Sequence, residues 1–188
     1  MKNQYYLIRH GHSLAQEKGI IVSSPSIGIT NYGLSSLGKK QAESAGQSLL
    51  HLKSPFIISS DFLRARETAE IIAKILNYPN SIQLEPSLRE RFFGDFEGLD
   101  NDKYEKIWEI DRQNPPHPPH QVESCSAVQN RIAKFITKLE QKYYEQDFIL
   151  VSHGDTLAIA ETFFQNFVAS NFLKILPFRN AEIRHYPQ

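Results

Sequence analysis

Short apolar runs and helical patterns alternate along this chain. Five runs rich in apolar and β-branched residues predict strands, at 5–8, 56–59, 82–85, 148–151 and 182–186. Between them, apolar residues recur every three or four positions, which is typical of helices with one buried face. This alternation predicts an α/β fold, a three-layer sandwich with a mainly parallel central sheet and helices on both faces. The length of 188 residues is consistent with a single domain, 1–188.

Four helices are expected to cover this sheet. Their predicted starting points are Ser35 or Ser36, Asp61, a capping box of Ser126 with Gln129, and His153-Gly154. The helix after Ser126 is expected to be the longest. The apolar face of the last helix is expected to run from Leu157 to Phe167 or Val168.

The alternation is interrupted by a small excursion near residues 99–122. A polar segment around Tyr104 and Trp108 is expected to be helical, and it runs into Asn114 and four prolines between positions 115 and 119. Proline lacks the backbone N–H of a helix, so this stretch is expected to be extended. A strand and two helices follow it, which favours an excursion over the sheet edge and not a linker between domains.

Composition and charge narrow the class of protein. Lys and Arg total 21, as do Asp and Glu, so there is no basic surplus to hold nucleic acid or an anionic membrane. The single Cys125 excludes an intrachain disulfide and favours a reducing compartment. No apolar run approaches the roughly 18 residues that span a bilayer. We therefore expect a cytoplasmic protein with no nucleic-acid or membrane partner, and the sequence leaves its oligomeric state open.

Polar groups follow the predicted strands directly. They are Arg9-His10-Gly11 after the first strand, Ser60-Asp61 after the second, Glu90 after the third and His153 after the fourth. In parallel sheets, ligands bind beyond the carboxyl ends of the strands. Arginine offers a fork of donors, imidazole can act as a nucleophile, and glycine lets the backbone approach an anion. The pattern indicates a site for a phosphate group.

Seven segments together resemble the histidine phosphatase superfamily, the phosphoglycerate mutase-like enzymes, which combine an N-terminal RHG with a C-terminal HG. The segments are RHG at 9–11, GLSSLGKKQA at 33–42, SSDFLRARET at 59–68, LRERFFGDFEG at 88–98, ES at 123–124, VSHGDT at 151–156 and NAEI at 180–183. The resemblance covers nearly the whole chain.

This resemblance implies a metal-independent phosphomonoesterase without a cofactor, which hydrolyses a small phosphorylated metabolite through a phosphohistidine. It implies His10 as the nucleophile and Glu90 as the proton donor to the leaving oxygen. Arg9, Arg64 and His153 would hold the phosphate. Because only a neutral imidazole can attack, the other ring nitrogen of His10 is expected to donate to a fixed acceptor such as a backbone carbonyl.

Further positions are expected to contribute to substrate binding, namely Gly11, Ser13, Gln16 and Gly154. Two residues depart from the family pattern. His12 stands where Glu or Gln is common, and Gln16 stands where many members have Asn. These departures leave the shape of one pocket wall open.

Other residues compete for some of these roles. Arg66 is the alternative to Arg64, and Glu97 is the second candidate acid. His117 and His120 would need a third ligand to bind a metal, so solvated loop histidines are expected and no metal site is predicted.

Two other functions remain open at this point. A phosphoglycerate mutase would share the site but must hold a second phosphate, and a non-catalytic protein would bind phosphate only. The excursion has only Lys103, Lys106 and Arg112 as fixed cations, which favours hydrolysis.

Overall fold

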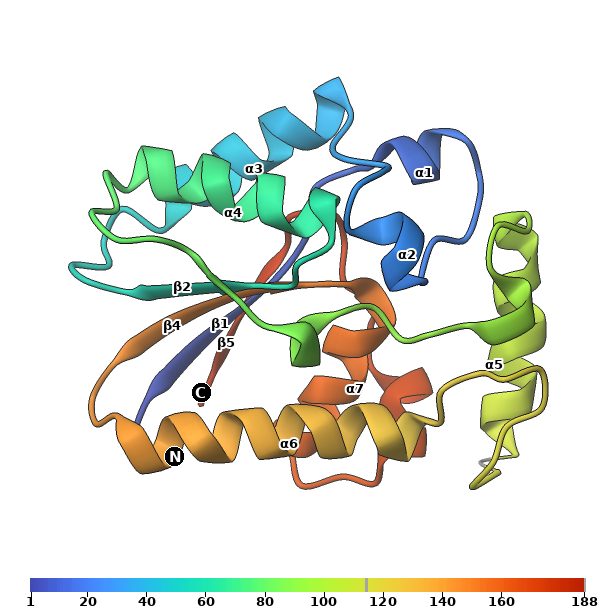
Figure 1. The fold of residues 1–188 in the computed structure, drawn as a ribbon. Helices are drawn as coiled ribbons and strands as arrows, with labels where there is room; N and C mark the ends of the chain where they lie inside the picture. The colour runs from blue at the N-terminus through green and yellow to red at the C-terminus, as the bar shows by residue number, and fades with distance from the viewer. Residues whose placement is uncertain (114, 188) are drawn as a thin grey trace.

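A five-stranded sheet forms the centre of the molecule (Figure 1). The computed structural model describes residues 1–113 and 115–187. The strands are β1 (Gln4–Arg9), β2 (Phe56–Ser59), β3 (Gln83–Leu84), β4 (Asp147–Ser152) and β5 (Ile183–Tyr186), in the order β3-β2-β4-β1-β5. Every neighbouring pair is parallel except β1 with β5. The mainly parallel sheet is therefore confirmed, and the last strand is its antiparallel edge.

Helices cover both faces of this sheet (Figure 1). One layer holds α3 (Ser36–Ser48) and α4 (Leu63–Ile75), and the other holds α6 (Cys125–Lys142) and α7 (Gly154–Phe164). Side chains alternate along a strand, so β1 contributes to both cores. Tyr5 and Leu7 pack on the α6 and α7 side, whereas Ile8 packs on the α3 and α4 side. The three-layer sandwich is thus confirmed.

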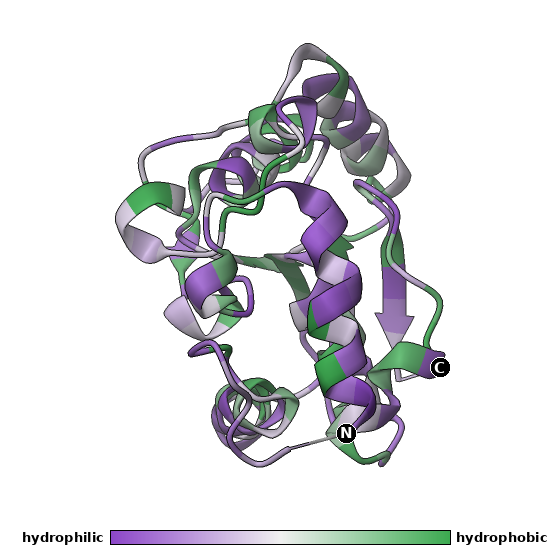
Figure 2. Ribbon diagram, turned by 90° about the vertical axis from the view of Figure 1, so that its right-hand side faces the viewer, coloured by the Kyte–Doolittle hydropathy of each residue, from purple (hydrophilic) through white to green (hydrophobic). Residues whose placement is uncertain are grey.

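Three shorter helices gather beyond the carboxyl ends of the parallel strands (Figure 1). They are α1 (Leu14–Glu17), α2 (Pro25–Gly28) and α5 (Tyr104–Arg112), and α5 is the helix expected in the excursion. Figure 2 looks onto this end of the molecule, where the helix in front is largely hydrophilic. Among the described residues, no helix is long and apolar enough to cross a membrane.

Two predicted helix ends are wrong. Ser124, and not Ser126, is the N-cap of α6, and its hydroxyl accepts the hydrogen bond from a backbone N–H of the first turn. The capping-box pattern favoured Ser126 as the N-cap. An N-cap residue needs only a side-chain oxygen that accepts from a backbone N–H of the first turn, and Ser124 provides one. Phe167 and Val168 lie beyond the end of α7 and are 50% and 65% exposed. The chain leaves the helix at Asn166, whose φ is 57°.

The proline segment is not helical, as predicted, but it bends and turns where an extended path was expected. His120 and Gln121 have φ values of 61° and 56°, and the carbonyl of His120 accepts a hydrogen bond from Asp95 N. Asn114 lies outside the described residues. The third strand is also shorter than expected, since only Gln83–Leu84 pairs.

Candidate active site

His10 lies directly after β1 and is buried. Its Nδ1 is 2.7 Å from the carbonyl oxygen of Gly11, and its Nε2 is 3.0 Å from Nε of Arg64. An arginine nitrogen can only donate, so Nε2 accepts and Nδ1 carries the proton. The ring is therefore the neutral tautomer, held by a backbone carbonyl as expected, with its lone pair on Nε2.

The surroundings of His10 favour this neutral form. Burial lowers the pKa of His10 well below its ordinary value, and the charges of Arg64 and Arg9 lower it further. His153 lies next to it, with ring centroids 5.1 Å apart. Burial and the charge of Arg64 lower the pKa of His153 as well. Both rings can remain uncharged in mildly acidic solution.

Three nitrogen atoms at this place are buried without a hydrogen-bond partner among the described residues: Arg9 Nε, Arg64 Nη1 and His153 Nδ1. The backbone carbonyl of Phe178 holds the guanidinium of Arg9 at 2.6 Å, and that of Val22 holds Arg64 at 2.9 Å. A buried polar atom without a partner costs about 1–3 kcal/mol. An anion that accepts from these groups would remove this cost.

Glu90 is nine-tenths buried and presents one oxygen to the site. Its Oε1 accepts from Arg91 N at 3.0 Å, from Thr156 N at 3.3 Å and from Thr156 Oγ1 at 3.1 Å. Within the described chain, Oε2 accepts no hydrogen bond. The carboxyl group is thus fixed through one oxygen and leaves the other for a ligand.

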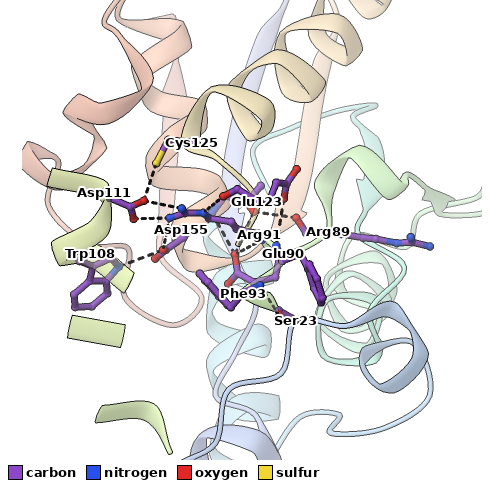
Figure 3. A network of polar contacts seen from close by, with 12 residues as sticks. Ser23, Arg89, Glu90, Arg91, Phe93, Trp108, Asp111, Glu123, Cys125 and Asp155 are labelled. Atoms are coloured by element: carbon purple, nitrogen blue, oxygen red, sulfur yellow. Dashed lines mark hydrogen bonds and ion pairs between the residues drawn. The ribbon is translucent and has the colours of Figure 1, made fainter. Parts of the chain in front are cut away.

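A buried ionic network that the sequence analysis missed lies beside Glu90 (Figure 3). Arg91 makes two hydrogen bonds to Asp111, at 2.6 and 2.7 Å, and its Nη1 is 3.9 Å from Asp155. The indole N–H of Trp108 donates to Asp155 at 3.2 Å. Asp155 follows the His-Gly motif directly, and Arg91 follows Glu90. Adjacency to the motif residues was the only signal for either.

Asp155 is an unusual carboxyl group in this network. Burial and the negative charge of Glu90 raise the pKa of Asp155 to about 7, although the charge of Arg91 opposes the shift. Asp155 therefore holds a proton more readily than an ordinary carboxyl group, close to the candidate proton donor.

A cavity of about 770 Å³ opens beside these groups. Arg9, Gln16, Glu90 and Gly154 are the predicted site residues that line it. A Cβ atom at Gly154 would come within 3.4 Å of Arg9 Cζ, so the glycine gives this guanidinium room. His10, Arg64 and His153 do not line this cavity, which adjoins the candidate phosphate site through Arg9 and Glu90.

Two predicted binding residues have other tasks. The N–H of Gly11 donates to Thr68 Oγ1 at 3.1 Å, and a Cβ at Gly11 would lie 2.4 Å from the carbonyl oxygen of Gly38. Close packing explains this glycine, and its N–H is not free for an anion. Ser13 caps α1 by accepting from Gln16 N at 3.3 Å, and it does not line the cavity.

Gln16, which departs from the family pattern, is held by Asn180. The two side-chain amides exchange hydrogen bonds of 3.2 and 3.1 Å, and Asn180 also donates to the carbonyl of His10 at 3.2 Å. Asn180 lies in the NAEI segment, and its contact with the site was not predicted.

The competing candidates lie elsewhere. Arg66 is 36% exposed at its side chain, whereas Arg64 is buried. Glu97 accepts from the N–H and the hydroxyl of Ser23, at 2.7 and 2.6 Å, and so holds two loops together. No group of three His, Cys, Asp or Glu side chains that could hold a metal occurs in the part of the chain that the structure describes.

The free energy of unfolding is expected to decrease as the pH falls below about 6.5, which is the ordinary pKa of histidine. The folded-state pKa values of His10 and His153 are lowered, so below this pH the unfolded chain binds more protons than the folded one. Each ring should contribute a slope of about 1.4 kcal/mol per pH unit until the folded ring also titrates. Urea denaturation at a series of pH values from 7 to 5 measures this slope.

Variants show whether the buried histidines cause this decrease in the free energy of unfolding. Asp155 contributes in the opposite direction because its pKa is raised. His10→Gln should therefore flatten the decrease, whereas replacing the exposed His51 in the same way should leave it as in the wild type. Equal slopes in the wild type and His10→Gln would contradict the proposed neutral, buried state.

Known proteins resemble this chain in sequence. The sequence profile of the histidine phosphatase superfamily (branch 1) matches residues 5–186. The adenosylcobalamin/alpha-ribazole phosphatase of Salmonella typhimurium is 28% identical over 161 residues, which cover 82% of this chain and 75% of that protein. The 2,3-bisphosphoglycerate-dependent phosphoglycerate mutase of Parvibaculum lavamentivorans is 28% identical over 167 residues, which cover 84% of this chain and 77% of that protein.

A solved structure shows the same fold. The mycobacterial glucosyl-3-phosphoglycerate phosphatase superposes with a TM-score of 0.82, over 97% of this chain and 91% of that one, at 23% sequence identity.

Proposed function

The chain belongs to the histidine phosphatase superfamily and is a phosphomonoesterase, and we propose that His10 is the nucleophile and Glu90 the proton donor toward a small phosphorylated metabolite. One observation carries this assignment: the unpartnered buried nitrogens of Arg9, Arg64 and His153 surround the neutral ring of His10. A phosphoryl group is the ligand that uses all of them at once.

In the first step, the Nε–H of Arg64 transfers its hydrogen bond from Nε2 of His10 to a phosphoryl oxygen, and the freed lone pair on Nε2 attacks phosphorus while the bond to the leaving oxygen breaks. Glu90 gives its proton to that oxygen, so the alcohol leaves uncharged. The hydrogen bond from Nδ1 to the carbonyl of Gly11 stabilises the positive charge that develops on the ring. Donors from Arg9 and Arg64 stabilise the charge on the phosphoryl oxygens.

In the second step, water attacks the phosphohistidine. Glu90, now a carboxylate, takes a proton from this water, and the bond between phosphorus and Nε2 breaks. His10 returns to its neutral form, and inorganic phosphate leaves through the cavity.

The excursion favours hydrolysis over mutase chemistry. Lys103 is bound to Asp102 at 2.7 Å, and Arg112 is bound to Glu105 at 2.7 Å. The third cation, Lys106, does not line the cavity. A mutase must hold a second phosphate through both half-reactions, and these three side chains offer no free charge for that purpose.

We extend the proposal to the protein as a whole. The balanced charge and the single cysteine support action in the cytoplasm on small molecules, without a nucleic-acid partner. The family match over residues 5–186 supports one catalytic domain for 1–188.

Release of phosphate from p-nitrophenyl phosphate, with and without a chelator, tests the proposed function. We expect turnover that the chelator does not change. Strong bisphosphoglycerate-dependent isomerisation of phosphoglycerate with little phosphate release would contradict hydrolysis, as would phosphate binding without any turnover.

Arg64→Met is expected to lower kcat/KM about 10- to 150-fold, because one charge-assisted hydrogen bond to the transition state contributes about 1.5–3 kcal/mol. Steady-state kinetics with p-nitrophenyl phosphate measures this loss. Arg66→Met is the matched control and should stay within about threefold of the wild type, the range of context effects on one contact. Equal activities of the two variants would place the phosphate elsewhere.

A further inference from the structure

The cavity beside His10 is lined by both charged and apolar side chains. Arg9 and Glu90 mark the end at which the phosphoryl group is transferred. Beyond them the walls are mostly apolar or aromatic, with Ile20, Tyr104, Trp108, Phe172, Leu173 and Phe178. A volume of about 770 Å³ exceeds what a phosphate ion needs. The space beyond the phosphate is therefore available to the leaving group.

The aromatic part of this wall is fixed by its neighbours. The rings of Tyr104 and Trp108 stack, with centroids 5.6 Å apart and 22° between their planes. Phe93 meets Tyr104 edge-on at 5.2 Å, and the indole N–H of Trp108 is bound to Asp155 (Figure 3). A rigid aromatic face binds a flat apolar group without having to be ordered first.

Among residues 1–113 and 115–187, the charged side chains along the cavity offer no free cation to a leaving group. They are Glu90, Asp102, Glu105 and Asp155 together with Arg9 and Arg112, and Asp102 and Glu105 are already paired with Lys103 and Arg112. Arg9 faces the phosphate end, and Arg112 is already bound to Glu105. Along the described lining, no cation is left for a second anionic group of the substrate. A carboxylate or second phosphate on the leaving group would lose its water there without gaining a cationic partner.

We propose that this enzyme takes phosphate monoesters whose leaving group is a bulky, uncharged alcohol or phenol with an apolar or aromatic body, and that it rejects monoesters with a second anionic group. The inference rests on the proposed function, because it requires the phosphoryl group to lie at His10. It places the selectivity in α5, which carries Tyr104, Trp108 and the pair of Glu105 with Arg112.

Two esters of equal shape test the charge selectivity: 4-carbamoylphenyl phosphate and 4-carboxyphenyl phosphate. They differ by one negative charge on the leaving group. We expect the wild-type enzyme to have a kcat/KM at least about tenfold higher for the carbamoyl ester, because the carboxylate would be desolvated without a cationic partner.

A variant in α5 shows whether the cavity causes this ratio. Glu105→Gln removes one acid and frees Arg112, so it should reduce the preference for the carbamoyl ester severalfold. Glu70→Gln is the matched control, because Glu70 forms the same kind of exposed pair with Arg66 on α4, away from the cavity. It should leave the ratio unchanged.

A second comparison tests the aromatic wall. The ratio of kcat/KM for 1-naphthyl phosphate to that for phenyl phosphate should fall several-fold in Trp108→Leu and remain near the wild-type value in Trp108→Phe. The change of ratio between variants cancels the different intrinsic reactivities of the two esters.

The outcomes distinguish this inference from the function on which it rests. Efficient phosphate release with equal kcat/KM for the carbamoyl and carboxyl esters would overturn the substrate class and leave hydrolysis standing. The same holds if Glu105→Gln and Glu70→Gln change the ratio equally. No release from any of the four esters, in an enzyme that is folded, would overturn the function and the inference together.

Discussion

His10→Ala is expected to reduce phosphate release by at least about 10⁴-fold, since removal of a covalent nucleophile abolishes the chemical path and not merely a contact. The geometry specifies the reacting atom. Nδ1 is committed to the carbonyl of Gly11, so the phosphoryl group must be bound through Nε2. Small amounts of added imidazole should partly restore turnover in the variant, because they return the missing group to the space that alanine leaves.

The covalent intermediate has its own signature. A labelled phosphoryl group trapped during turnover should survive alkaline quench and be lost in acid, as a phosphohistidine requires. His51→Ala is the control, since this exposed ring lies outside the site and its loss should change neither rate nor label. An acid-stable label, or a His10→Ala variant that retains its rate, would remove His10 from the mechanism.

The position of the catalytic histidines follows from the sequence through simple topology. The apolar runs before His10 and His153 predict buried strands, and adjacent parallel strands end at the same edge of a sheet. In the structure β1 and β4 are neighbours, with Arg9 paired to Ser152. The residue that follows each of these strands is a histidine, so the register of β1 and β4 alone places the two rings side by side.

The network beside Glu90 lay beyond such reasoning. Arg91 and Asp111 are both almost fully buried, yet neither has a motif or a period that links them. Charged residues in polar runs are normally exposed, so the sequence favours a surface location for both. Only the packing of α5 against Arg91 and the start of α7, both outside the excursion, brings Asp111 and Asp155 to Arg91.

Apolar periodicity failed at the end of α7 for a related reason. Phe167 and Val168 continue the apolar pattern of the helix, but the chain turns before them and both are largely exposed. The apolar period predicts which residues share a helix face, but it does not predict where the backbone leaves the helix. The boundary depends on local conformation at Asn166, whose positive φ ends the regular path.

Glu90→Gln is expected to lower kcat/KM for aliphatic monoesters about 10²- to 10⁴-fold, the usual contribution of a general acid. The same variant should keep a kcat/KM for p-nitrophenyl phosphate close to the wild-type value, because p-nitrophenolate leaves without a proton. Glutamine keeps a carbonyl oxygen for the three hydrogen bonds from Arg91 and Thr156, so the position of the side chain is preserved. Glycerol 2-phosphate and p-nitrophenyl phosphate form a suitable pair, and kcat/KM is the quantity to compare, because it excludes the later hydrolysis of the phosphohistidine, in which Glu90 acts as a base on both esters alike.

The dependence on the leaving group is what identifies the role of Glu90. A variant that only disturbs the fold or the phosphate site slows both esters by the same factor, because both must place the same phosphoryl group at His10. Glu97→Gln should behave in this way, since Glu97 joins Ser23 to its loop and has no proton to deliver. Equal losses of kcat/KM for the two esters in Glu90→Gln would show that Glu90 is a structural group, and the proton would then have to come from another carboxyl group of the lining, such as Asp155, whose pKa is raised.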